Sequence, residues 1–161
     1  MEKEDSKKDE CCPKFDTTLW QDRTFDWNDK LFATGKVTCL FHIPLNMGQV
    51  ITRMMGKIDA ANALDPEFIM LTEDPTPWVS DQFIPVLKEV PGLKHVKLSG
   101  KFITKVYEGP YQEAKNWYTD MFKFAESQGM KASKVYFYYT TCPKCAKKWG
   151  KNYVVGFARV G

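Results

Sequence analysis

The spacing of apolar positions in residues 36–90 predicts a strand, a helix and two further strands. A β-rich run at 36–43 ends before a proline, and the apolar residues after it recur at steps of three and four, which is typical of one buried helix face. These helix-face residues are Met47, Val50, Ile51, Met54, Ile58 and Ala61. Two more β-rich runs at 68–72 and 79–87 complete the unit, and Pro85 is expected at a strand end or sheet edge.

Residues 97–161 repeat this order of elements. A strand is predicted at 101–108, Gly109-Pro110 opens a helix, and two strands follow at 135–140 and 153–160. The apolar face of this second helix is Tyr111, Ala114, Trp117, Tyr118, Met121, Phe122 and Ala125. We interpret the two units, 36–90 and 97–161, as an internal duplication.

The duplication predicts an α+β fold of two strand–helix–strand–strand modules related by a pseudo-twofold axis. Each module alone is too small to bury its apolar surface. We therefore expect one antiparallel sheet with two helices flanking a central groove, because ligands tend to bind where two units meet.

Residues 1–35 are expected to stand apart from the domain that spans 36–161. Their start is almost wholly charged and polar, which is typical of a disordered tail and unlike a signal peptide. The rings that follow have no clean period, so we expect an irregular aromatic-rich arm. These rings are Phe15, Trp20, Phe25, Trp27 and Phe32.

Composition narrows the class of partner. The net charge of +3 is too small to indicate a nucleic-acid-binding protein, and no window approaches the roughly 18 apolar residues of a membrane span. The odd count of five cysteines, together with the absence of a signal peptide, indicates a reducing cytoplasm. The aromatic fraction of 14% is high and hints at a binding surface.

The aromatic residues near the predicted groove are the candidate ligand-binding groups, because tyrosine and tryptophan rings stack on organic molecules while their polar atoms fix orientation. The expected ligand-binding residues are Phe41, His42, Pro44, Met47, Val50, Tyr107, Tyr111, Trp117, Tyr136 and Tyr138. Plain core packing is the alternative for about half of these rings.

Glu108 is the candidate catalytic residue. It occupies the same place in the second unit as His42 in the first, two residues before the proline at the start of each helix. A carboxylate beside aromatic rings can have a raised pKa and act as a general acid or base. The alternatives are a solvated carboxylate for Glu108 and a structural imidazole for His42.

The cysteines raise the question of a zinc site. Cys142 and Cys145 form a C-x-x-C pair in a predicted hairpin, and Cys11 with Cys12 would complete four ligands. Adjacent cysteines suit a tetrahedral site poorly, so inert thiols are the alternative, and we expect neither a metal nor another cofactor. Cys39 is expected in the core.

Several segments resemble the GyrI-like small-molecule-binding domain, which is also the effector-binding domain of bacterial multidrug-sensing regulators. They are the Tyr-Glu-Gly-Pro-Tyr stretch at 107–111, the helix with Trp117, and the strands at 136–141 and 154–160. The resemblance implies a stand-alone bacterial domain with a central ligand groove that binds xenobiotics. For one subfamily it also implies an aromatic cage that hydrolyses cyclopropane-bearing, DNA-alkylating natural products.

One departure from that family concerns charge. Drug-sensing members often carry a buried glutamate that pairs with cationic drugs, and the matching place here holds Tyr136 or Phe137. Without that acid a buried cation loses its partner, so neutral or anionic, amphipathic or aromatic ligands are expected.

The leading functional prediction is therefore a small-molecule-binding protein. The first alternative is a hydrolase that detoxifies reactive xenobiotics in the same groove. The second is a protein-interaction adaptor or gyrase modulator that uses the arm and a lysine-rich loop at 144–151.

Overall fold

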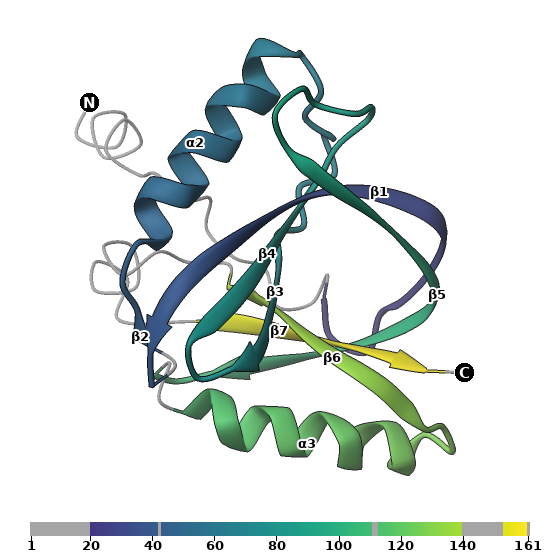
Figure 1. Ribbon diagram of the computed structural model, residues 1–161. Coiled ribbons are helices and arrows are strands. Elements are labelled where there is room, and N and C mark those ends of the chain that lie inside the picture. The colour runs from purple at the N-terminus through teal and green to yellow at the C-terminus, as the bar shows by residue number, and fades with distance from the viewer. Residues whose placement is uncertain (1–19, 42, 111–112, 140–152, 161) are drawn as a thin grey trace, which may run out of the picture.

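The computed structural model describes residues 20–41, 43–110, 113–139 and 153–160, and the statements below concern those residues. Each half of the chain contributes a long strand, a helix and two further strands, and a two-residue strand follows the first of these (Figure 1). The elements are β1 (Thr24–Leu40), β2 (Ile43–Pro44), α2 (Met47–Ala60), β3 (Leu71–Thr76), β4 (Val79–Pro85), β5 (Lys94–Glu108), α3 (Ala114–Ser127), β6 (Ala132–Tyr139) and β7 (Tyr153–Val160).

The strands close into an antiparallel barrel. Their order around the barrel is β1-β4-β3-β6-β7-β5, and β5 pairs back to β1 from Thr24↔Ile103 to Thr34↔Lys94, while β2 extends from the end of β1. The expected open sheet with two helices flanking a groove is therefore wrong. The expectation was wrong because it made the strands too short. β1 and β5 are 17 and 15 residues long. Strands of this length twist and coil enough for the two edges of the sheet to pair with each other.

A β-bulge explains why the start of β1 shows no clean period. The pairing with β5 shifts between Trp27 and Lys30, where Asp29 has a φ of 52°. Phe25 and Trp27 before the bulge, and Phe32 after it, all pack in the barrel interior, although their numbers differ in parity. Residues 24–35 thus belong to a strand rather than to an irregular arm.

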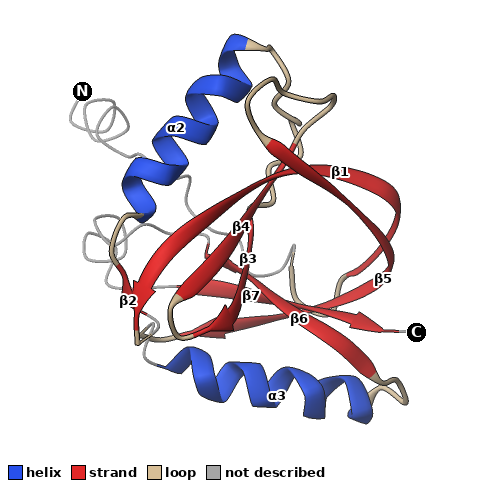
Figure 2. Ribbon diagram, in the orientation of Figure 1, coloured by secondary structure: helices blue, strands red, loops and turns tan. Residues whose placement is uncertain are grey.

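The two helices lie outside the barrel, on separate parts of its wall (Figure 2). α2 packs against β1 and buries Val50, Met54 and Ile58, and α3 packs against β6 and β7 and buries Trp117 and Met121. Within the described residues the predicted apolar faces of both helices are confirmed except at Tyr118, which is 48% exposed, and Pro85 lies at the end of β4 as predicted. Neither helix is long and apolar enough to cross a membrane.

Each helix approaches the wall closely over a glycine. A Cβ on Gly156 of β7 would lie 2.5 Å from the sulfur of Met121, and one on Gly35 of β1 would clash with the sulfur of Met54. The two methionines fill the space that the missing side chains leave, so the helices sit in equivalent ways on the two halves.

Candidate functional site

The barrel interior is lined mainly by aromatic rings. Five of the six barrel strands and the turn before β1 contribute them: Trp20, Phe25, Trp27, Phe32, Phe83, Phe102, Tyr136, Tyr138 and Phe157. The Trp27 ring lies 4.6 Å from Phe102 and stacks on Phe157 at 6.1 Å with an interplanar angle of 20°. Contacts of this kind between offset or tilted rings are favourable beyond simple burial.

The cluster is not sealed on all sides. Trp20, Trp27 and Tyr138 are half-buried, whereas the other rings of the cluster are buried. Trp27 also borders the β-bulge, where the ladder between β1 and β5 is interrupted. These three rings are therefore the part of the interior that a ligand can reach with the least rearrangement.

One end of the barrel is closed by the segment before β1. The buried Thr104 hydroxyl donates to the carbonyl of Trp20 and accepts the N–H of Arg23 at 3.0 Å. The Arg23 guanidinium lies 4.3 Å from the centre of the Phe25 ring, a cation–π distance. Trp20 is held over this end of the ring cluster as a result.

The other end of the interior carries two ion pairs. Lys36 contacts Asp81 at 3.4 Å, and Lys134 contacts Glu73 at 3.3 Å. Glu73 and Asp81 stand opposite each other on β3 and β4, one rung beyond the interior pair Leu71 and Phe83. Side chains two residues apart share a face of a strand, so both carboxylates point toward the same end of the interior.

Tyr136 lies where the ring cluster meets this charged end. Burial raises the pKa of its phenol, and the nearby Glu73 carboxylate adds to the rise, while Lys134 opposes it. The phenol is therefore a neutral hydrogen-bond donor at physiological pH, placed between apolar rings and a carboxylate.

Glu73 and Asp81 were missed in the sequence. The turn-rich stretch at 74–77 hid the strand that carries Glu73, although the alternation of Leu71 with Glu73 and of Phe83 with Asp81 was visible. A carboxylate near Tyr136 thus comes from a neighbouring strand rather than from the position expected by resemblance.

The candidate ligand-binding residues fall in separate places. Tyr136 and Tyr138 belong to the interior cluster, whereas Tyr107 and Trp117 stack on each other at 5.5 Å outside the barrel, under α3. Val50 and Met47 pack from α2 onto the outer face of β1.

The remaining candidates lie near the strand ends or outside the described part of the chain. Phe41 is 70% exposed and contacts Trp78, and Pro44 is exposed in β2. Glu108 is exposed at the last position of β5, opposite Tyr153. His42 and Tyr111 fall outside the described residues.

The zinc question also falls largely outside the described residues. Cys11, Cys12, Cys142 and Cys145 are not among them, and the part that is described holds no group of three or more metal-ligating side chains. Cys39 is buried between β1 and α2, which confirms it as a core residue.

A polar network ties the outer tyrosine in place. The Tyr107 hydroxyl donates to Asp120 Oδ2 at 2.6 Å, and Lys105 Nζ lies 2.7 Å from the same oxygen. Burial and the Asp120 carboxylate raise the pKa of Tyr107, and hydrogen bonds from Lys105 and Tyr107 lower the pKa of Asp120 below its ordinary 3.8. The network fastens α3 to β5.

Replacing Asp120 by asparagine is expected to lower the free energy of unfolding near neutral pH by about 1 kcal/mol, once solvent screening of these half-exposed groups is allowed for. Because folding lowers the carboxyl pKa, its contribution is present above the unfolded value of 3.8 and is lost as the pH falls through the folded value. Urea denaturation from neutral to acidic pH should therefore show the difference between wild type and Asp120→Asn shrinking in acid. Asp59→Asn, at an exposed site on α2, is the control, and an equal effect of both variants contradicts the assignment.

Comparison with known proteins assigns a family. A family model described as "Bacterial hydrolase" matches residues 2–160. No curated protein matches the sequence significantly.

Solved structures share the fold at low sequence identity. A hydrolase from Listeria innocua is 14% identical with a TM-score of 0.56, and 99% of this chain and 98% of that chain are covered. The C-terminal domain of EcmrR is 11% identical with a TM-score of 0.61, covering 89% and 98%. SAV2435 bound to tetraphenylphosphonium is 7% identical with a TM-score of 0.53, covering 88% and 94%. At this level of identity the likenesses show that the fold is shared.

Proposed function

The chain belongs to the bacterial hydrolase family, and we propose that it binds a ring-bearing organic molecule in the aromatic interior of its barrel. The observation that carries this proposal is the interior itself, in which half-buried Trp20, Trp27 and Tyr138 border a cluster of buried rings. Sites for organic ligands are lined mainly by apolar and aromatic groups with a few polar ones. SAV2435, which shares the fold, has been solved bound to tetraphenylphosphonium.

Entry of the ligand requires displacement of rings at the margin. Trp27 adjoins the interrupted part of the ladder between β1 and β5, so it moves with little loss of backbone pairing. The ligand then stacks on Phe157 and Phe102, the partners of Trp27, and the displaced Trp27 ring packs against the ligand in turn.

The charges at the end of the interior favour a neutral ligand. Lys36 with Asp81, and Lys134 with Glu73, already compensate each other. A buried cation or anion would have to break one of these pairs to gain a partner, and an unpaired buried charge is costly. A neutral molecule places its rings against the cluster and accepts a hydrogen bond from the Tyr136 phenol.

A fluorescence titration with N-phenyl-1-naphthylamine, a neutral aromatic probe, tests this proposal. We expect saturable binding that Trp27→Leu and Tyr138→Leu each weaken about fivefold, because each variant removes a ring contact of about 1 kcal/mol. Trp78→Leu is the matched control, since Trp78 is an exposed ring that does not belong to the interior cluster. Circular dichroism establishes that each variant is folded.

Two results would overturn the interior site. One is wild-type affinity in both Trp27→Leu and Tyr138→Leu. The other is a loss in Trp78→Leu as large as in those variants, which would move the site to the exposed rings around Phe41.

Hydrolysis of a reactive, strained ligand in the same interior is the second candidate function. The family description favours it, and Glu73 lies within electrostatic reach of Tyr136 at the charged end. In this assignment Glu73 takes a proton from water as the water attacks the ring, and the Tyr136 phenol donates a proton to the carbon or oxygen that leaves. Glu108, at the last position of β5, is the alternative base.

Product analysis by mass spectrometry separates binding from turnover. With a cyclopropane-bearing electrophile, hydrolysis predicts a product one water heavier whose formation Glu73→Gln abolishes while binding of the neutral probe persists. Glu108→Gln should keep wild-type turnover. Loss of turnover in Glu108→Gln alone would transfer the base to that residue, and absence of product with wild type, despite binding, would leave a binding protein.

A further inference from the structure

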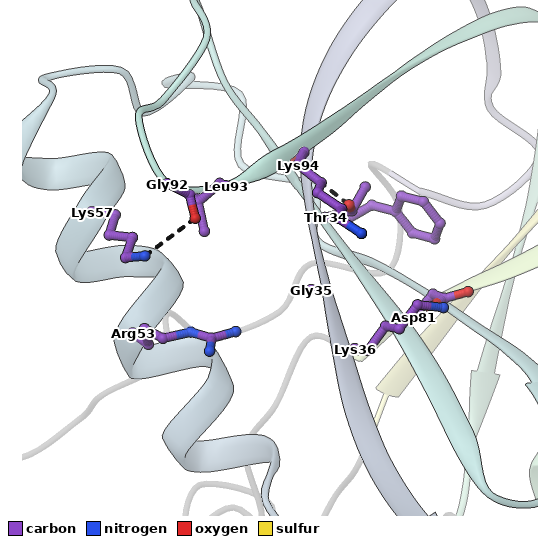
Figure 3. Close-up of a pocket in the computed structure, with 10 residues that line it drawn as sticks. Thr34, Gly35, Lys36, Arg53, Lys57, Asp81, Gly92, Leu93 and Lys94 are labelled. Atoms are coloured by element: carbon purple, nitrogen blue, oxygen red, sulfur yellow. Dashed lines mark hydrogen bonds and ion pairs between the residues drawn. The ribbon is translucent and has the colours of Figure 1, made fainter.

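A cleft whose chemistry differs from that of the aromatic interior lies between α2 and the open side of β1 (Figure 3). It measures about 430 Å³ and is lined by three strand positions on β1, two cations on α2, and residues of β4 and of the loop that leads into β5. The lining residues that matter are Lys36, Arg53, Lys57, Asp81, Leu93 and Lys94. Its volume falls in the range of small-molecule sites.

The cleft exists because β1 continues beyond the point where its pairing with β5 ends. Pairing with β5 ends at Thr34↔Lys94, and pairing with β2 resumes only at Cys39. In between, the Thr38 backbone is engaged by the turn before α2, through Asn46 Oδ1 at 2.8 Å and the Leu45 N–H at 2.9 Å.

The backbone N–H and C=O groups of β1 in this unpaired stretch are available to a ligand. Alternate residues of a strand direct their N–H and C=O groups to the same side, so Lys36 directs its groups to the same open side as Thr34 and Thr38. Within the described residues no strand pairs with Lys36 on that side. Gly35 beside it lets α2 come close to the strand, because Met54 fills the space that the missing side chain leaves.

The lining has a strong excess of positive charge. Four cationic side chains face one carboxylate, which leaves a net +3, as large as the net charge of the whole chain. Asp81 pairs with Lys36, and Lys57 Nζ contacts only the neutral carbonyl of Gly92, at 3.2 Å. Among the described residues no carboxylate pairs with Arg53, Lys57 or Lys94.

The arrangement on α2 is unfavourable without a partner. Arg53 and Lys57 are four residues apart on one helix face, where like charges repel. Arg53 extends from α2 toward the strand in the close-up view, and Lys57 reaches the loop at Gly92 (Figure 3). An anion between them would remove this repulsion and accept charge-assisted hydrogen bonds.

We propose that this cleft binds a small organic anion, whose phosphate or carboxylate group contacts Arg53, Lys57 and Lys94 while its apolar part lies along Leu93 and Phe83. The planar guanidinium of Arg53 suits two-point contact with either headgroup. The cleft shares Phe83 and the Lys36–Asp81 pair with the charged end of the interior, but the cations that would hold the anion, Arg53, Lys57 and Lys94, lie outside the ring cluster, so variants at these cations test the cleft separately.

Two-dimensional amide NMR with four small probes tests it: phenyl phosphate, benzoate, benzylammonium and benzyl alcohol. We expect phenyl phosphate and benzoate to shift the amides of residues 34–36, 53–57 and 92–94, and the other two probes to leave them unchanged. A larger effect of phenyl phosphate would indicate a phosphate ligand, and a larger effect of benzoate a carboxylate ligand. Added salt should weaken binding, because screening acts on exposed charges.

Two single-residue variants test whether the anion binds at Arg53. Arg53→Gln is expected to weaken anion binding about tenfold, through loss of a charged hydrogen bond, whereas Lys115→Gln on the exposed face of α3 should leave it unchanged. Arg53 is exposed, so both variants should fold, which the same spectra show directly. Wild-type affinity in Arg53→Gln, equal binding of benzylammonium, or anion-induced shifts confined to other residues would each overturn the proposal.

Discussion

The antiparallel seam between β1 and β5 is the contact on which the rest of this structure depends. It joins the first strands of the two halves and turns a sheet with two free edges into a closed wall. A closed barrel has an inside, and that inside is where the rings of both halves meet. Without the seam these rings would face water on one side of a sheet, and the helices could not bury them, since both helices pack on the outer surface.

The bulge in β1 determines which of the side chains along the seam point into the barrel. A strand without it would present Phe25 and Trp27 on one face and Phe32 on the other. The shift between Trp27 and Lys30 turns all three inward, at the cost of one interrupted stretch of ladder. The same interruption leaves Trp27 as a half-buried ring beside weakened pairing, so the feature that completes the core also gives the most direct way into it.

The sequence was informative where a single period persisted and misleading where the period changed. Both helix faces, from Val50 to Ile58 and from Trp117 to Ala125, were predicted because each keeps the helical repeat for its whole length. The start of β1 was assigned to an irregular arm because the bulge breaks the two-residue alternation. Closure of the sheet was not predictable from local patterns, since it depends on pairing between residues about 60 to 80 positions apart.

The residues of the candidate site were likewise predicted only in part from the sequence. Tyr136 and Tyr138 could be assigned to one face of a strand, and they share the interior, but alternation alone did not say which face was the inside. Tyr107 and Trp117 also meet, under α3, where the hydrogen bond from Tyr107 to Asp120 fastens the helix. Glu73 was missed because prolines and turn residues at 74–77 concealed the end of its strand, whereas Asp81 lies on a strand that was predicted and was not singled out there.

Intermolecular nuclear Overhauser effects from a bound neutral aromatic ligand test the central claim most directly. An interior site predicts contacts from the ligand to Trp27, Tyr138 and Phe157, together with altered signals from Trp27 as its ring moves aside at the bulge. Contacts to Tyr107 and Trp117 instead, with the interior rings unchanged, would place the ligand under α3 and contradict the account.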